Sequence, residues 1–337
     1  MDEGRLASAG RPFRVPVARI TVARTALIDP GAVVWSKRSM SSKGPLSGLE
    51  RLAILAIILT WGLNNAAAKV ATAHLPPMMV GALRFALALM FLFPFIKPPF
   101  PQPRRLLAIV LLSGPIHFAL IYIAFGMGKS LSALVVASQL WIPFTAIFAW
   151  RMLGESMRLP AVLGLVIAFA GVAWMSLDPH GAADLKAIGL VVIACACWAL
   201  ATVLVRQTPG VKPLKVQGMT ALVAAPVMLA MSFTFETDVV HRTLTAPWYV
   251  WGCVAFAGVV STIGASALLF WLVQRREAGQ VTPYFLLTPL VSCTIGVLFM
   301  GDVVTSQLVI GAGATMLGVA LVALTEKKVI PPEGEAT

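Results

Sequence analysis

Charged residues are scarce in this chain, because aspartate, glutamate, lysine and arginine make up only 12% of its 337 residues. Only 14 residues are acidic, and each lies in a terminus, in a loop or at the end of an apolar segment. Proton relays in membrane pumps usually depend on a carboxylate near mid-membrane. The lack of one argues against the buried Asp or Glu relay that many proton-coupled pumps use.

The patterns of metal sites, catalytic sites and nucleotide sites are missing as well. The four cysteines lie inside apolar runs without C-x-x-C spacing, so we expect small buried hydrophobic side chains there. The apolar segments hold no H-E-x-x-H motif, no nucleophile–base pair and no paired carboxylates, and no Walker motif occurs. The sequence therefore predicts no enzyme, no metal, no cofactor and no ATP drive.

Apolar residues dominate instead, at 58% of the chain with a mean hydropathy of +0.87. A soluble domain of this composition would have too little polar surface to face water. A membrane span needs about 20 mostly apolar residues, since each residue rises about 1.5 Å through roughly 30 Å of hydrocarbon. We predict an all-α membrane protein with ten transmembrane helices, at roughly 52–71, 77–96, 104–126, 130–150, 159–177, 186–206, 213–234, 248–273, 279–300 and 304–325.

The distribution of positive charge is typical of a membrane protein and not of a nucleic-acid-binding surface. The net charge is +12, but the cations are distributed over short loops between the apolar segments. Sixteen lysines and arginines flank the spans on one side, and only Lys129, Lys186 and Arg242 lie on the other. By the positive-inside rule we expect a multi-pass protein of the bacterial inner membrane with both termini in the cytoplasm. Residues 1–50 are Arg-rich without a signal-sequence run, and we expect a disordered or spurious N-terminal extension there.

The two halves of the chain repeat each other. Each half holds five predicted spans, an odd number, so the second half must enter the membrane from the opposite side. Inverted repeats are typical of secondary transporters, with the substrate site near mid-membrane between the halves. We therefore expect repeats at 51–178 and 185–325 and a cytoplasmic tail at 326–337. The offset of 147 residues relates Gly154, Glu155, Gly164, Gly171 and Val172 to Gly301, Asp302, Gly311, Gly318 and Val319.

The repeated residues have structural interpretations. Gly164 and Gly171 are seven residues apart and share a helix face, where small residues let two backbones approach closely. Glu155 and Asp302 precede predicted helices, and we expect them to cap those helices.

A few polar residues lie inside the predicted spans, where such groups are costly and usually functional. Arg84 lies about 10 Å deep at helical rise, whereas Lys69 is near the end of the first span and can reach the interface. We hypothesise that one or both cations attract anionic or zwitterionic solutes. His117 is either a hydrogen-bonding strut or a proton carrier. The predicted substrate-binding residues are Asn64, Asn65, Arg84, His117, Gln139, Trp141, Trp198, Ser266, Trp271 and Tyr284.

Several short motifs carry a family resemblance that covers about residues 50–325. They are Trp61-Gly62-Leu63-Asn64, Lys69, Pro77 and Leu83-Arg84-Phe85, then Pro143 through Gly154-Glu155, and Pro289 through Gly301-Asp302. The chain resembles the EamA branch of the drug/metabolite transporter superfamily, and within it the O-acetylserine/cysteine exporter type. The resemblance implies two inverted five-helix EamA repeats and export of amino acids or related metabolites.

The sequence thus predicts a secondary transporter that exports small amino-acid-like metabolites by alternating access. Alternatives are a carrier of the same fold for organic cations, nucleobases or sugars, a channel, and a membrane-embedded enzyme. The expected partners are a small-molecule substrate and the lipid bilayer, with no nucleic acid. Coupling to a proton or a counter-solute and assembly as a homodimer remain open from the sequence.

Overall fold

The computed structural model describes residues 46–155, 157–176, 184–208, 212–273, 275–276, 281 and 284–325, which belong to one compact unit. Most of the predicted N-terminal extension and all of the tail at 326–337 lie outside the described residues. In chain order the elements are α2 (Gly48–His74), α3 (Pro77–Leu92), η2 (Phe93–Phe95), α4 (Pro103–Leu111), η3 (Leu112–Ile116), α5 (His117–Met127), α6 (Leu131–Ser138), α7 (Trp141–Leu153), α8 (Leu159–Met175), α10 (Leu185–Arg206), α11 (Pro213–Phe235), α12 (Val239–Leu244), α13 (Trp248–Ala255), η4 (Phe256–Ala265), α14 (Ser266–Val273), α16 (Thr288–Phe299) and α17 (Ser306–Thr325).

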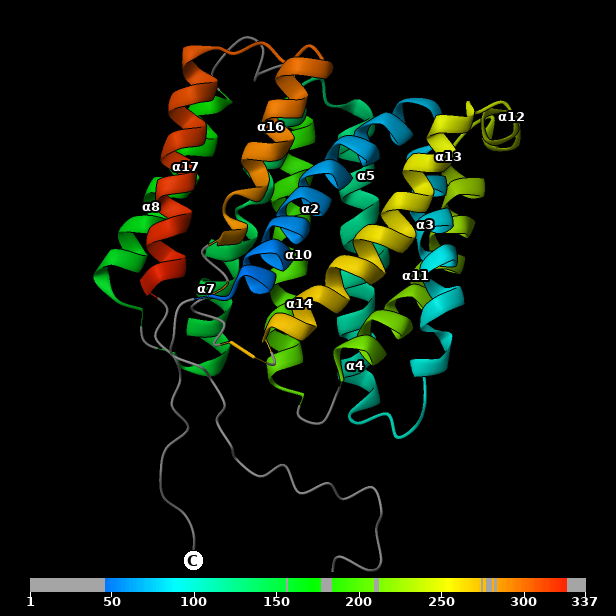
Figure 1. Ribbon diagram of the computed structural model, residues 1–337, viewed down its shortest axis with the longest axis horizontal. Coiled ribbons are helices and arrows are strands. Elements are labelled where there is room, and N and C mark those ends of the chain that lie inside the picture. Colours follow the sequence, from blue (N-terminus) through cyan, green and yellow to red (C-terminus); the bar gives the residue numbers. More distant parts are fainter. Residues whose placement is uncertain are drawn as a thin grey trace, which may run out of the picture. The chain divides into compact units, whose positions relative to one another are not determined.

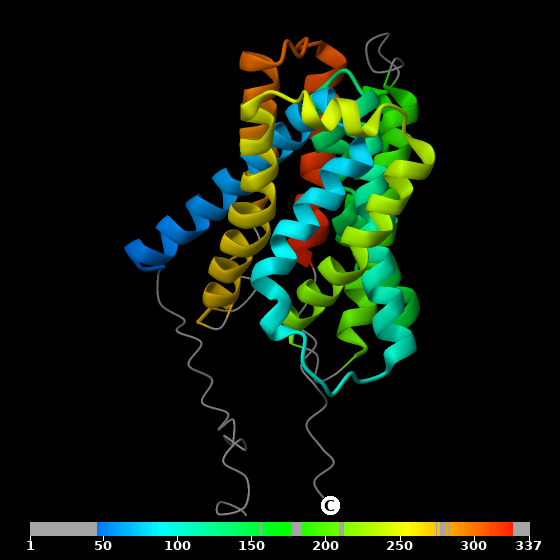
Figure 2. The ribbon, with the colours of Figure 1, turned by 90° about the vertical axis from the view of Figure 1, so that its right-hand side faces the viewer.

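These elements form a bundle of helices (Figures 1 and 2). Within the described residues, eight helical segments are long and apolar enough to cross a membrane, and α8 and α16 are shorter apolar helices. The predicted all-α membrane fold is confirmed. The α16 helix is short because the ninth predicted span breaks at Leu286-Leu287, and its 12 residues rise only about 18 Å.

The same break occurs in the first half. There α6 ends at Ser138, and the turn at Gln139-Leu140 separates it from α7. This turn precedes Pro143, and the turn at 286–287 precedes Pro289; proline lacks the N–H that continuous helix would need. The two turns are 147 residues apart, so the sequence repeat also appears in the irregularities of the backbone.

A second shared irregularity lies in the third and eighth spans. Residues 112–116 (η3) and 256–265 (η4) form π-helical turns between α-helical segments. In η3, Gly114 leaves helical geometry at φ −105° and ψ −107°, directly before Pro115. Single π turns change the direction in which the following side chains point and are frequent at functional sites.

The α8 and α17 helices pack directly against each other through glycines (Figure 1). A Cβ atom on Gly164 would lie 2.6 Å from the carbonyl oxygen of Gly318, and one on Gly171 would lie 2.6 Å from that of Gly311. The predicted close approach is therefore present. Because Gly164 and Gly171 correspond in the repeat to Gly311 and Gly318, this crosswise pairing makes the two equivalent helices antiparallel.

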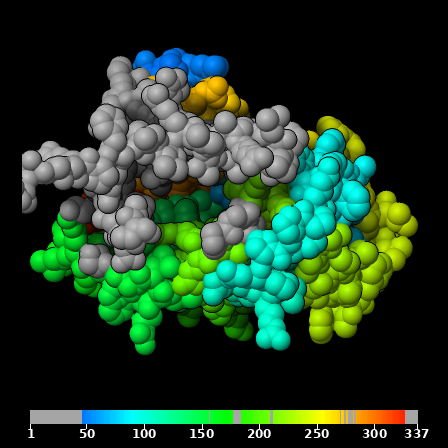
Figure 3. Space-filling view, turned by 90° about the horizontal axis from the view of Figure 1, so that it is seen from below, coloured from blue at the N-terminus to red at the C-terminus, as the bar shows by residue number. Residues whose placement is uncertain are grey.

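Contacts between the halves also form near the loop that joins α3 to α4. Lys215 of α11 donates from Nζ to the carbonyl oxygen of Pro99 over 3.0 Å, and this nitrogen lies 5.5 Å from the ring centre of Phe100. Figure 3 looks onto this end of the bundle, where the first-half loop (cyan) lies beside the second half (yellow-green).

The prediction that Asp302 caps the helix it precedes is wrong. Its carboxylate accepts hydrogen bonds from the N–H groups of Leu131 (3.0 Å) and Ser132 (2.6 Å) and from the Ser132 hydroxyl (2.5 Å). Asp302 therefore caps α6, in the other half. It lies four residues before α17, too far upstream for the cap position, and Thr305 caps α17 through the N–H of Leu308.

The corresponding prediction for Glu155 is also wrong. Glu155 forms an ion pair with Arg206 at the end of α10, and Arg158 occupies the N-cap position of α8. Glu155 thus contacts the second half through an ion pair, whereas Asp302 contacts the first half through hydrogen bonds to the start of α6. The Glu155–Arg206 pair is partly exposed, whereas Asp302 is buried.

Lys69 forms hydrogen bonds at the end of α5. Its Nζ donates to the carbonyl oxygens of Phe125 (2.8 Å) and Gly128. Asp184, before α10, accepts from the N–H groups of Lys129 (2.6 Å) and Ser130 (2.7 Å). The turn between α5 and α6 is therefore clamped by polar side chains from other parts of the chain.

Candidate functional site

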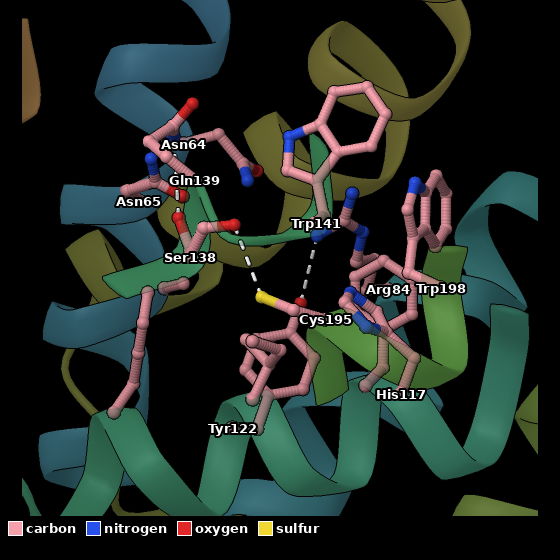
Figure 4. A pocket seen from close by; sticks show the side chains of 14 residues that line it. Asn64, Asn65, Arg84, His117, Tyr122, Ser138, Gln139, Trp141, Cys195 and Trp198 are labelled. Carbon is pink, nitrogen blue, oxygen red and sulfur yellow. Dashed lines mark hydrogen bonds between the residues drawn. The ribbon is translucent and has the colours of Figure 1, made fainter. Parts of the chain in front are cut away.

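A cavity of about 210 Å³ lies among α2, α3, α5, the α6–α7 break and α10 (Figure 4). Four of these parts belong to the first half, and α10 supplies the second-half wall. Ser138 and Gln139 line the cavity at the point where the chain leaves regular helix between α6 and α7. The cavity is lined by Asn64, Asn65, Ala68, Arg84, His117, Phe118, Ile121, Tyr122, Phe125, Ser138, Gln139, Trp141, Cys195 and Trp198.

Seven of the ten predicted binding residues line this cavity: Asn64, Asn65, Arg84, His117, Gln139, Trp141 and Trp198. The structure does not bring the other three to it. Ser266 accepts a hydrogen bond from Gln217 (2.9 Å), the Trp271 ring lies 4.3 Å from the Arg275 guanidinium, and Tyr284 is 44% exposed. The sequence indicates the depth of these three residues along their spans, and depth does not determine which side of a helix faces inward.

Sequence reasoning missed several lining residues on α5. Phe118, Ile121, Tyr122 and Phe125 recur at intervals of three and four residues directly after His117, which places them on one helix face. This stripe contains the only tyrosine in the described part of the cavity wall. The helical spacing around His117 was the signal that could have identified them.

Arg84 is 7% exposed and has only neutral partners in the described structure. Its Nη1 donates to the Tyr122 hydroxyl (3.0 Å), and its Nε donates to Thr262 Oγ1 in η4 (3.1 Å). The guanidinium carbon also lies 4.8 Å from the ring centre of Phe118. No described carboxylate forms an ion pair with Arg84, so a positive charge inside the bundle remains without a counter-charge.

The hydroxyl protons around Arg84 are arranged differently on its two partners. Thr262 donates its proton to the carbonyl oxygen of Ala257 (2.7 Å), five residues back along the π-helical turn, and accepts from Arg84. Tyr122 accepts from Arg84, and its own proton has no acceptor among the described residues. Arg84 and Tyr122 together therefore present hydrogen-bond donors suited to an anion.

The amide side chains lie on the other side of the cavity from Arg84 and Trp198 (Figure 4). Asn65 donates from Nδ2 to Ser292 Oγ (3.1 Å), which links α2 to α16. Within the described part of the chain, the Gln139 amide nitrogen makes only long hydrogen bonds, to Ser138 Oγ (3.4 Å) and to the Val135 carbonyl (3.5 Å). Bonds of this length are weak, so the Gln139 amide can reorient toward a ligand at little cost.

His117 stands beside the aromatic wall of the cavity. Its Nδ1 lies 2.8 Å from the carbonyl oxygen of Ala194 in α10, so the side chain is a strut between the halves, one of its two predicted roles. The ring centre lies 4.9 Å from that of Phe118 and 5.0 Å from that of Trp198.

Comparison with known proteins agrees with this architecture. The model of the EamA-like transporter family matches residues 49–177 and 185–324. An uncharacterized transporter of Bacillus subtilis is 26% identical over 274 residues, covering 79% of this chain and 88% of that protein. A probable amino-acid metabolite efflux pump of Escherichia coli is 24% identical over 283 residues, covering 81% and 94%.

A solved crystal structure shares the fold with a TM-score of 0.56 at 17% sequence identity, covering 82% of this chain and 96% of that one. The family match extends over most of the chain and falls in two parts, as the repeated helix breaks do. The chain therefore belongs to the EamA-like transporter family, and it is a multi-pass membrane transporter and not an enzyme.

Proposed function

We propose that this transporter exports small amino-acid-like metabolites by alternating access between the repeats at 51–178 and 185–325. The observation that carries the proposal is the positive charge of Arg84 in the cavity wall, for which the described residues supply no counter-charge. The name of the Escherichia coli relative, a probable amino-acid metabolite efflux pump, supports the same substrate class.

The carboxylate group of such a metabolite supplies what Arg84 lacks. A charge removed from water is costly unless a counter-charge and hydrogen bonds compensate it. A carboxylate can accept at once from the guanidinium and from the Tyr122 hydroxyl, whose proton has no acceptor among the described residues. An organic cation would add a second positive charge to a cavity with no described acidic side chain, so this alternative fits less well.

Counterflow in proteoliposomes tests the substrate class. We expect trans-stimulation by amino acids and none by organic cations. In Arg84→Gln the apparent affinity for the amino acid should fall about 10- to 100-fold, the equivalent of one charged hydrogen-bonding partner. Arg84→Lys should retain part of the activity, because it keeps the charge.

Arg242→Gln is the matched control, since Arg242 lies outside the cavity, is half-buried and bonds only to the His74 carbonyl in the described structure. Unchanged uptake in Arg84→Gln, or trans-stimulation by cations alone, would contradict the proposal.

We also propose an inner-membrane orientation with both termini in the cytoplasm, supported by the loop charges. In a variant lacking the four native cysteines, a cysteine replacing Lys129 should react with an impermeant maleimide added to intact cells. A cysteine replacing Lys97 should react only in inside-out vesicles. Labelling of both positions from the same side would contradict this orientation, and denatured samples control for reactivity.

A further inference from the structure

The second ring nitrogen of His117, Nε2, is not used by the hydrogen bond to Ala194. A carbonyl oxygen only accepts hydrogen bonds, so the Nδ1 atom facing Ala194 must carry the hydrogen. In the neutral ring, Nε2 then bears a lone pair and is an acceptor. Ala194 thus selects the tautomer of His117.

This acceptor is open to the cavity. No described residue forms a hydrogen bond with Nε2 of His117. Among the described residues, two side-chain atoms are fully enclosed and lack a hydrogen-bond partner: Asn64 Oδ1 and Thr288 Oγ1. Nε2 of His117 is not one of these enclosed atoms. Because His117 lines the cavity, a ligand there can reach Nε2, whereas the Asn64 oxygen is shielded by protein.

His117 and Arg84 lie along one continuous wall. The Arg84 guanidinium lies 4.8 Å from the Phe118 ring centre, and that ring lies 4.9 Å from His117. Trp198 continues the wall, 5.0 Å beyond His117. Aromatic faces attract ammonium groups, so this wall offers an anion site at one position and a site for a cationic donor beside it.

We propose that His117 determines specificity by accepting a hydrogen bond from the protonated amine of a substrate whose carboxylate binds Arg84 and Tyr122. The substrate class is then zwitterionic amino acids, not carboxylates in general. This inference rests on the proposed function for its carboxylate half. The π-helical turn of η3 contributes by placing His117 as the first residue of α5.

The test compares each transported amino acid with its deamino analogue, in the wild-type transporter and in two variants. The wild type should prefer the amino acid. His117→Phe keeps an aromatic ring but removes the acceptor, so amino-acid affinity should fall roughly tenfold while affinity for the deamino analogue stays nearly unchanged. His117→Gln can donate to Ala194 and still accept from the amine, and it should restore the preference.

The outcomes separate this inference from the proposed function. If His117→Phe lost affinity equally for the amino acid and for its deamino analogue, His117 would act only as a strut and the inference would be overturned. The proposed transport of carboxylates would not be affected by that result. Transport of neither ligand by the wild type would overturn both. If His117→Phe does not fold, the test uses the ligand preferences of the wild type and of His117→Gln. A wild type that does not prefer the amino acid over its deamino analogue overturns the inference.

Discussion

Gly311→Leu will prevent α17 from packing on α8 and will abolish or severely reduce the yield of folded transporter. A Cβ atom on Gly311 would lie 2.6 Å from the Gly171 carbonyl oxygen and 2.8 Å from the Met175 Cβ. Overpacking typically costs 1–3 kcal/mol even where side chains can adjust, and a helix backbone cannot move aside alone. We therefore expect a loss of at least about 3 kcal/mol, because close packing drives helix association in lipid.

Gly313→Leu is the control on the same helix, because a Cβ atom on Gly313 meets nothing within 4 Å. Thermal unfolding in detergent, followed by the monodisperse fraction in size-exclusion chromatography, measures the difference. Similar melting temperatures for the two variants would contradict the role assigned to the glycine contact.

Asp302→Ala will have the next largest effect on stability. The substitution leaves the N–H groups of Leu131 and Ser132 and the Ser132 hydroxyl without their acceptor. A buried donor without a partner costs about 1–3 kcal/mol, so we expect destabilisation on the order of 3 kcal/mol. The stability of Asp302→Asn should lie between that of the wild type and that of Asp302→Ala, since an amide keeps one acceptor oxygen.

The repeat-equivalent variant Glu155→Ala provides the comparison. It removes the ion pair with Arg206, whose side chain is 43% exposed, and exposed pairs contribute about 0–1 kcal/mol. Its thermal unfolding should therefore stay close to that of the wild type. If the two alanine variants lost equal stability, the cap that Asp302 forms on α6 would have no special energetic role.

The residues of the site show how far prediction from sequence reaches. Arg84 and His117 could be selected because a charged or titratable group inside an apolar span is conspicuous. Tyr122 could not, since a tyrosine in an apolar helix is unremarkable until its hydroxyl is seen to contact Arg84. Thr262 is similar, because its contact with Arg84 joins residues 178 positions apart through a π-helical turn.

The spans and the repeat follow from the sequence alone, because a long apolar run must satisfy its own backbone hydrogen bonds in lipid and does so as a helix. The partners of Asp302, Lys69 and Arg84 were decided only in the tertiary structure. Each partner depends on how a helix is rotated and crossed against another that is distant in the chain. Hydropathy reports the depth of a residue, whereas packing determines the direction in which its side chain points.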